Sequence, residues 1–96
     1  MEINDEELNQ ERTLLNDLEQ RNIRAFMRLY RNYSEDLLIF TYSHLHDRRV
    51  AIKMVEEFFE DLWSMAKFTE INPPIYRYLV EQMRFIIEQK SIFITK

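Results

Sequence analysis

The sequence predicts an all-α fold, a small bundle of three to four helices around one central amphipathic helix. Glycine is absent from the 96 residues, and the only two prolines are adjacent. Sandwiches and barrels need many tight turns, and such turns favour glycine, so its absence indicates few, long elements. We expect a single domain over residues 1–96, which at this size buries roughly 60–65% of the surface that its unfolded chain exposes.

The central helix is predicted over Val50 to Ala66. Its apolar residues recur at steps of three and four, which places them on one face of an α-helix. This apolar face consists of Ala51, Met54, Val55, Phe58, Phe59, Leu62, Trp63 and Ala66. The opposite face is charged and consists of Lys53, Glu56, Glu57, Glu60 and Asp61. This charged face is either solvated or bound by a partner, whereas the aromatic-rich face forms the core.

Two helices are predicted before the central one. The first is short, follows a polar and frayed start, and extends to about Glu19. Its inward residues are Leu8, Leu14, Leu15 and Leu18. Asn22 is a suitable N-cap for a long second helix, residues 23–45, which either runs straight or kinks near Tyr33–Glu35. Asp47 can then cap the central helix. The stripe of the second helix consists of Phe26, Leu29, Tyr30, Tyr33, Leu37, Leu38, Phe40, Thr41 and Leu45.

One linker and one helix are predicted after the central helix. The linker covers residues 68–74, because its two prolines lack backbone donors and disfavour helical geometry in the residue before them. The last helix is expected from about Pro74 to Lys90, and residues 91–96 are expected to trail. The inward residues of this helix are Ile75, Tyr78, Leu79, Met83, Ile86 and Ile87. The folded core therefore covers about residues 14–90.

Several classes of site have no support in the sequence. The chain has no cysteine, which excludes disulfides and thiolate metal sites. His44 and His46 are two residues apart, so they point to different sides of a helix and cannot share a metal. Neither a glycine-rich phosphate loop nor a nucleophile–base pattern occurs, so we expect no catalytic residue, metal or cofactor. Apolar runs are short and the start is acidic, which predicts a cytoplasmic chain without membrane insertion.

Two further surface features each allow two interpretations. Residues 21–31 hold an arginine stripe without acids, namely Arg21, Arg24, Arg28 and Arg31. These arginines either pair with Glu11, Asp17 and Glu19 of the first helix or bind phosphates or an acidic partner. A second set combines aromatic and basic side chains, namely Phe68, Tyr76, Arg77, Arg84 and Phe85. These either pack along a helix edge or stack on unpaired bases. The net charge of −4 argues against nucleic-acid binding by the isolated chain.

Four segments, taken in order, are similar to a known family. They read AFMRLYRNY, LLIFTYSHLHD, VEEFFEDLW and, after a short linker, IYRYLVEQM. Over about residues 14–90 the chain resembles the second conserved region of the extracytoplasmic-function (ECF) sigma factors of bacterial RNA polymerase. The runs from Ala25 to Tyr33 and from Val55 to Trp63 carry most of this resemblance, and the second run is the more specific.

The resemblance implies a function in transcription initiation. The central helix would bind the clamp helices of the polymerase β′ subunit, through Lys53, Glu56, Glu57, Glu60 and Asp61. The linker and the last helix would recognise and open the −10 promoter element, through Lys67, Asn72, Tyr76, Arg77 and Arg84. The implied partners are RNA polymerase core, promoter DNA within the holoenzyme and an anti-sigma factor.

The sequence departs from this family at several surface positions. Val50, Ile52 and Lys53 stand where the family usually has acidic residues, Glu56 where it has Gln, and Phe85 where it favours Asn. The alternative function is a diverged protein-interaction module, regulator-binding or homodimeric, without promoter opening. Exposure of the apolar side chains of Ile52 and Phe85 would favour this alternative.

Overall fold

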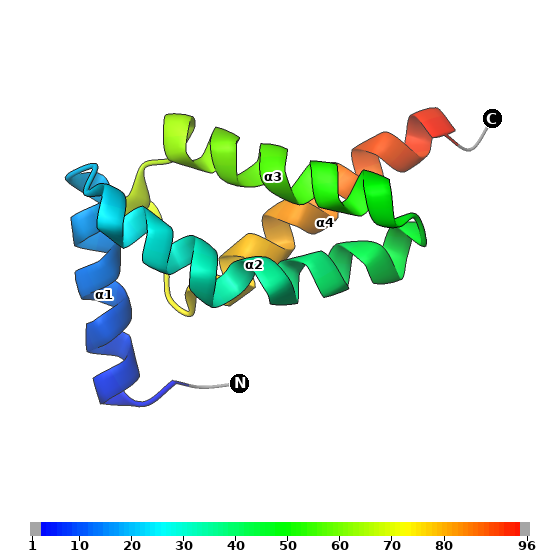
Figure 1. Ribbon diagram of the computed structural model, residues 1–96. Helices are drawn as coiled ribbons and strands as arrows, with labels where there is room; N and C mark the ends of the chain where they lie inside the picture. The colour runs from blue at the N-terminus through cyan, green and yellow to red at the C-terminus, as the bar shows by residue number, and fades with distance from the viewer. Residues whose placement is uncertain (1–2, 95–96) are drawn as a thin grey trace.

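The computed structural model describes residues 3–94, and it describes their side chains except at residues 65 and 91–94. This part of the chain is all-helical, as predicted. Its elements are α1 (Asp5–Glu19), α2 (Ile23–Leu45), α3 (Arg48–Met65), the 3-10 turn η1 (Phe68–Glu70) and α4 (Ile75–Ile94). Helices α2 and α3 run side by side, α4 crosses behind them, and α1 stands across the end where α2 begins (Figure 1).

Helix α1 begins earlier than predicted, and side-chain hydrogen bonds stabilise its first turn. The Asn4 side chain accepts a hydrogen bond from the Glu7 amide at 2.8 Å, and the Glu7 carboxylate accepts one from the Asn4 amide at 3.2 Å. This capping box satisfies two otherwise unpaired donors, and the acidic residues of the first turn complement the helix dipole. The expectation of a frayed start is therefore wrong from Asp5 onward.

Helix α2 is continuous from Ile23 to Leu45, so of the two expected forms the chain adopts the unbroken one. The predicted N-cap is confirmed, since the Asn22 side chain accepts hydrogen bonds from the amides of Arg24 and Ala25. Thr41 is fully buried, and its hydroxyl donates a hydrogen bond to the carbonyl of Leu37 at 2.8 Å. The buried hydroxyl therefore has a hydrogen-bond partner within the core.

Helix α3 is capped as predicted, because the Asp47 carboxylate accepts a hydrogen bond from the Val50 amide at 3.2 Å. The prediction for the last helix was only partly correct. Helix α4 begins at Ile75, directly after Pro74, and it continues to Ile94. The expected trailing tail is thus wrong over residues 91–94, which belong to α4, and residues 95–96 lie outside the described residues.

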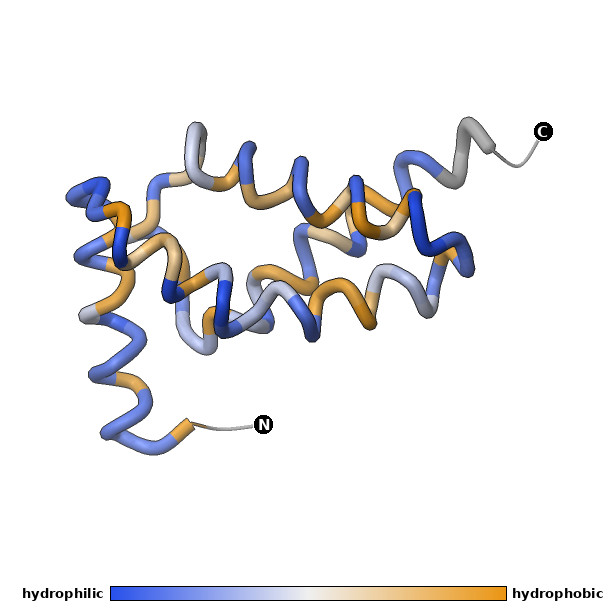
Figure 2. The backbone as a smooth tube through the Cα atoms, in the orientation of Figure 1, coloured by the Kyte–Doolittle hydropathy of each residue, from blue (hydrophilic) through white to orange (hydrophobic). Residues whose placement is uncertain are grey.

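The core lies where α2, α3 and α4 face one another and where α1 covers their open end. In Figure 2, the hydrophobic parts of α3 turn toward the other helices and its hydrophilic parts turn away. The predicted inward positions of α3 and α4 are buried or packed against the core. Two linker residues, Phe68 and Ile71, are also buried, so the linker is anchored to the bundle. Tyr30 is the main departure, with an exposed fraction of 40%.

No helix within residues 3–94 has both the length and the apolar composition needed to cross a lipid bilayer.

Candidate functional site

The main candidate site is a groove along the seam between α2 and α3. It consists of three adjoining hollows of about 280, 240 and 360 Å³. The first two share Tyr30 and Glu56, and the last two share Leu38. We call this surface the α2–α3 groove. Its α2 wall is formed by Phe26, Tyr30, Ser34, Glu35, Leu38, Ile39 and Tyr42, and its α3 wall by Arg48, Ile52, Val55, Glu56, Phe59, Glu60 and Trp63.

Large apolar side chains remain exposed along the α2–α3 groove. Ile39 is 61% exposed, Tyr42 is 48% exposed, and Ile52 on the facing helix is 36% exposed. Ile23 and Met27 extend this surface toward the start of α2, since they precede Tyr30 by seven and three residues and share its face. A contiguous exposed apolar surface with a polar edge is typical of a protein-binding site.

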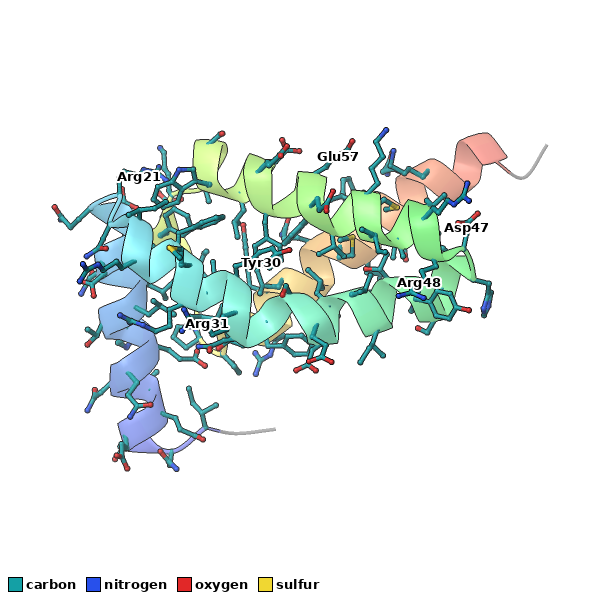
Figure 3. The ribbon with its side chains drawn as sticks, viewed as in Figure 1. Arg21, Tyr30, Arg31, Asp47, Arg48 and Glu57 are labelled. Atoms are coloured by element: carbon teal, nitrogen blue, oxygen red, sulfur yellow. The ribbon has the colours of Figure 1, made fainter. Side chains whose placement is uncertain are left out.

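The floor of the groove is built from interlocking aromatic rings. Tyr30 meets Phe59 edge to face, with ring centroids 5.0 Å apart, and lies between α2 and α3 in Figure 3. Phe26 contacts Phe59 at 6.4 Å and Trp63 at 4.7 Å. Because these rings fix one another, the groove presents a surface already shaped for a partner.

The five charged residues predicted on the central helix are all exposed, but they do not share one surface. Glu56 and Glu60 line the α2–α3 groove. Lys53 and Glu57 lie on the outer crest of α3 by helical spacing, and Glu57 points away from the bundle in Figure 3. Asp61 lines a different groove, between α3 and α4. The sequence analysis did not identify the apolar part of the site on α2, although Ile39 and Tyr42 lie off the inward stripe.

The predicted DNA-binding aromatic, Tyr76, is engaged within the fold. Its ring stacks on Tyr33 with centroids 6.1 Å apart, and its hydroxyl donates to the carbonyl of Asp36 at 3.5 Å. Burial, followed by the charge of Asp36, raises the pKa of Tyr76. The guanidinium of Arg84 lies 5.6 Å from the ring centroid of Phe40. Both side chains therefore pack along α2, as the helix-edge interpretation predicts.

The remaining members of the predicted nucleic-acid surface are divided among several places. Lys67, Asn72 and Arg77 are exposed near the linker and the first turn of α4. Phe68 is fully buried, so the prediction that it could stack on a base is wrong. Phe85 is 58% exposed but lies in the groove between α3 and α4, away from Arg84.

Arg21 does not belong to a surface stripe with the other three arginines. It precedes α2, with a φ of 59°, and its guanidinium reaches the C-terminal end of α3. There it donates to the carbonyls of Trp63 at 2.6 Å and Ala66 at 3.1 Å. It also lies over the rings of Trp63 and Phe68, at 5.4 and 5.0 Å. Arg21 is thus a cap for α3, whereas Arg24, Arg28 and Arg31 are exposed on α2.

Two acids of α1, which one of the two interpretations pairs with arginines, are bonded to neutral groups. Glu11 accepts hydrogen bonds from the Ile75 amide at 2.8 Å and from the Tyr33 hydroxyl at 3.5 Å. Glu19 accepts one from the Thr69 amide at 3.4 Å. Glu11 therefore caps α4 from another helix and fixes the end of the linker to α1. No local sequence pattern reveals this contact, because the two residues are 64 positions apart.

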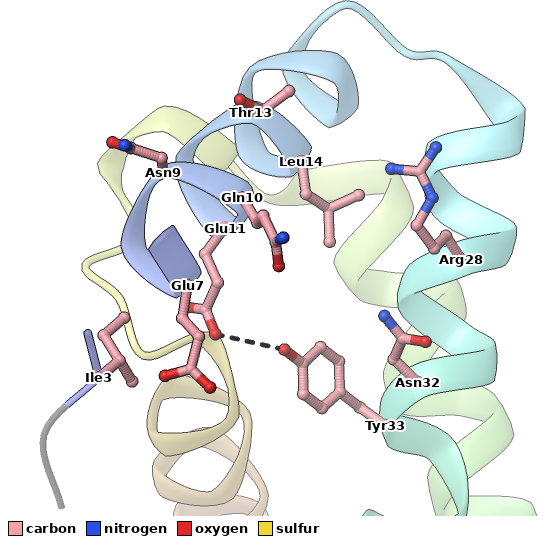
Figure 4. A pocket seen from close by; sticks show the side chains of 10 residues that line it. All are labelled: Ile3, Glu7, Asn9, Gln10, Glu11, Thr13, Leu14, Arg28, Asn32 and Tyr33. Atoms are coloured by element: carbon pink, nitrogen blue, oxygen red, sulfur yellow. Dashed lines mark hydrogen bonds between the residues drawn. The ribbon is translucent and has the colours of Figure 1, made fainter. Parts of the chain in front are cut away.

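Glu11 and Tyr33 also lie in the hollow between α1 and α2, which has a volume of about 590 Å³. Figure 4 shows the Tyr33 hydroxyl directed at Glu11, with Arg28 and Asn32 on the same wall. Burial, together with the charge of Glu11 and its hydrogen bond, raises the pKa of Tyr33 to about 12. The Glu11 carboxylate and the Tyr33 hydroxyl at the base of this hollow thus stabilise the packing of α1 on α2.

The raised pKa of Tyr33 predicts a loss of stability in alkaline solution. Its ordinary value is 10.0 and its value in the fold is about 12, so the unfolded chain loses this proton first. The contribution to stability is complete below pH 10 and is lost as the pH rises through 12. Urea unfolding between pH 10 and pH 12 should show that the free energy of unfolding declines as the pH rises. Tyr33→Phe should make this decline less steep. An unchanged slope in the variant would contradict the assignment to Tyr33.

Within residues 3–94, no group of three or more His, Cys, Asp or Glu side chains is placed to hold a metal ion. The hollows described above are the α2–α3 groove, the groove between α3 and α4, and the hollow beside α1. Of these, the α2–α3 groove combines exposed apolar side chains with two of the predicted partner-binding acids. A comparison of the chain with protein-family models, curated protein sequences and solved structures finds no match.

Proposed function

We propose that this chain is a sigma-like module that binds RNA polymerase core through the α2–α3 groove. The observation that carries the proposal is the aromatic-floored groove itself, with acidic Glu56 and Glu60 on its α3 wall. The resemblance to ECF sigma factors implies that this helix contacts the clamp helices of the β′ subunit. Helices of a partner are a suitable occupant, because a groove of exposed apolar residues between two helices accepts an amphipathic helix.

The proposal includes a second contact, to the −10 promoter element within the holoenzyme. Lys67, Asn72 and Arg77 support it, because they are exposed near the linker and the start of α4. Tyr76 and Arg84 contribute there only if they leave their packing on α2, so promoter opening is the weaker half of this function. A role on polymerase places the chain in the cytoplasm, with an anti-sigma factor as a further partner, and requires no catalysis.

The second candidate function is a diverged interaction module that binds a regulator or a second copy of itself. Exposure of Ile52 and Phe85 favours it, because both are apolar at positions where the family has polar residues. The two candidates differ in whether the α2–α3 groove binds polymerase.

Titration of the domain with an isolated β′ clamp-helix fragment tests the proposal. The wild-type domain should bind with micromolar or tighter affinity, and Glu56→Lys/Glu60→Lys should weaken binding about tenfold or more. The matched control is Glu81→Lys/Glu88→Lys, which makes the same charge change on exposed positions of α4 and should leave the affinity nearly unchanged.

Two outcomes would contradict the polymerase proposal. One is the absence of binding by a folded wild-type domain, which would favour the second candidate function. The other is an equal loss for both charge-reversal variants, since this would indicate attraction to net charge rather than docking in the groove. Repeating the titration with Ile52→Gln distinguishes docking in the groove from attraction to net charge, because this variant removes an apolar contact without a change of charge.

A further inference from the structure

A second apolar groove lies between α3 and α4 and has no part in the proposed binding of polymerase. Both helices pack closely on α2, but they approach each other much less closely, so a channel of about 410 Å³ remains between them. We call it the α3–α4 groove. It is lined by Phe58, Asp61 and Leu62 of α3, by Ala66 just after α3, and by Tyr78, Gln82, Phe85 and Ile86 of α4.

The wall of this groove exposes a large aromatic side chain that the core does not need. Phe85 is 58% exposed, whereas Phe58 and Leu62 on the facing helix are buried below the groove. Tyr78, Gln82 and Phe85 follow one another at steps of four and three, so they form one face of α4 along the channel. Because the ring of Phe85 lies exposed above an apolar floor, it is removed from water only when a partner binds over it.

The charged residue that lines the α3–α4 groove is an acid, and three further acids lie within one turn of its lining residues. Asp61 lines it, Glu57 precedes Asp61 by one turn, and Glu81 and Glu88 flank Phe85 along α4. These four side chains are exposed. Arg84 of α4 lies elsewhere, since its guanidinium lies over the ring of Phe40 on α2. Glu81 and Glu88 thus lie within one turn of Phe85, whereas Arg84 packs on α2.

We propose that the α3–α4 groove binds a basic amphipathic helix of a partner protein. Apolar side chains of that helix cover Phe85 and fill the channel, while its Lys or Arg side chains pair with Asp61 and the neighbouring glutamates. A second copy of this chain is a poor occupant, because a symmetric contact through Phe85 would bring two acidic edges together. The partner is therefore defined by positive charge combined with one apolar helical face.

A display library of helical peptides tests this inference. The peptides have about 18 residues, roughly five turns, with one fixed leucine face and with polar positions drawn from Lys, Glu and Gln. Selection on the wild-type domain should enrich Lys at the polar positions. The affinity of enriched peptides should fall about tenfold or more with Phe85→Gln and with Asp61→Lys, because both changes act at the centre of the groove.

The matched control is Ile52→Gln, which makes the same kind of change in the α2–α3 groove and should leave peptide affinity unchanged. Circular dichroism should show wild-type helicity for all three variants, since each position is exposed. Enrichment of Glu, no enrichment at all, or a loss with Ile52→Gln but not with Phe85→Gln would overturn the proposal. Sedimentation that shows a wild-type dimer dissociated by Phe85→Gln would overturn it in favour of self-association.

Discussion

Phe59→Ala is expected to lower the free energy of unfolding by about 3–5 kcal/mol, the cost of removing a buried aromatic side chain and leaving a cavity. Phe59 is only 2% exposed and meets three other rings, those of Phe26, Tyr30 and Phe58. A domain of this length has a total stability of roughly 5–14 kcal/mol, so the variant should lose a large fraction of its stability. Urea denaturation followed by circular dichroism measures the change.

Phe85→Ala is the matched control for this experiment, since it makes the same substitution at an exposed Phe. We expect a change within about 0.5 kcal/mol, as for most surface substitutions. Equal losses for the two variants would show that Phe85 supports the bundle, which would contradict the assignment of its groove to a partner. A small loss for Phe59→Ala would contradict the position of Phe59 in the core.

Arg21→Met is expected to lower the free energy of unfolding by about 1–3 kcal/mol. The variant removes two charge-assisted hydrogen bonds to the carbonyls of Trp63 and Ala66, where the negative end of the α3 dipole lies. It also removes the position of the guanidinium over Trp63 and Phe68, although solvent at this exposed site reduces each contribution. Thermal unfolding should shift downward by roughly 4–8 °C for each kcal/mol.

Two further variants distinguish the effect of losing the α3 cap from the effect of losing a positive charge. Arg24→Met makes the same substitution at an exposed position of α2 and should leave stability within about 0.5 kcal/mol of wild type. Arg21→Lys keeps the charge but loses the planar fork that reaches two carbonyls, so it should recover only part of the loss. If Arg24→Met proved as costly as Arg21→Met, the effect would come from net charge and not from the capping of α3.

The helices could be predicted because their signals are local. Asn22 and Asp47 cap helices at the positions where their side chains are expected to do so, and the apolar spacing around Phe59 identifies the buried face of α3. The structure differs from the prediction at both ends of the chain, since the Asn4–Glu7 capping box starts α1 at Asp5 and α4 continues past Lys90 to Ile94.

Only part of the candidate site could be predicted from the sequence. Helical spacing identified an outer charged face on α3, but this face spans more than one surface, and spacing does not show which side a neighbouring helix covers. The structure places Glu56 and Glu60 beside exposed residues of α2 and places Asp61 beside Phe85. Tyr76 was similarly assigned to DNA binding, but its ring is stacked on Tyr33 of another helix.

The sequence by itself determined the all-α class, the order of the helices, the N-caps of α2 and α3 and most of the buried faces. These features depend on residues within one or two turns of each other, and such distances are visible in the order of the chain. Only the tertiary structure decided that Arg21 caps α3, that Glu11 caps α4 and that two separate grooves flank α3. The two capping contacts join residues 42 and 64 positions apart, and the grooves depend on how whole helices pack against one another.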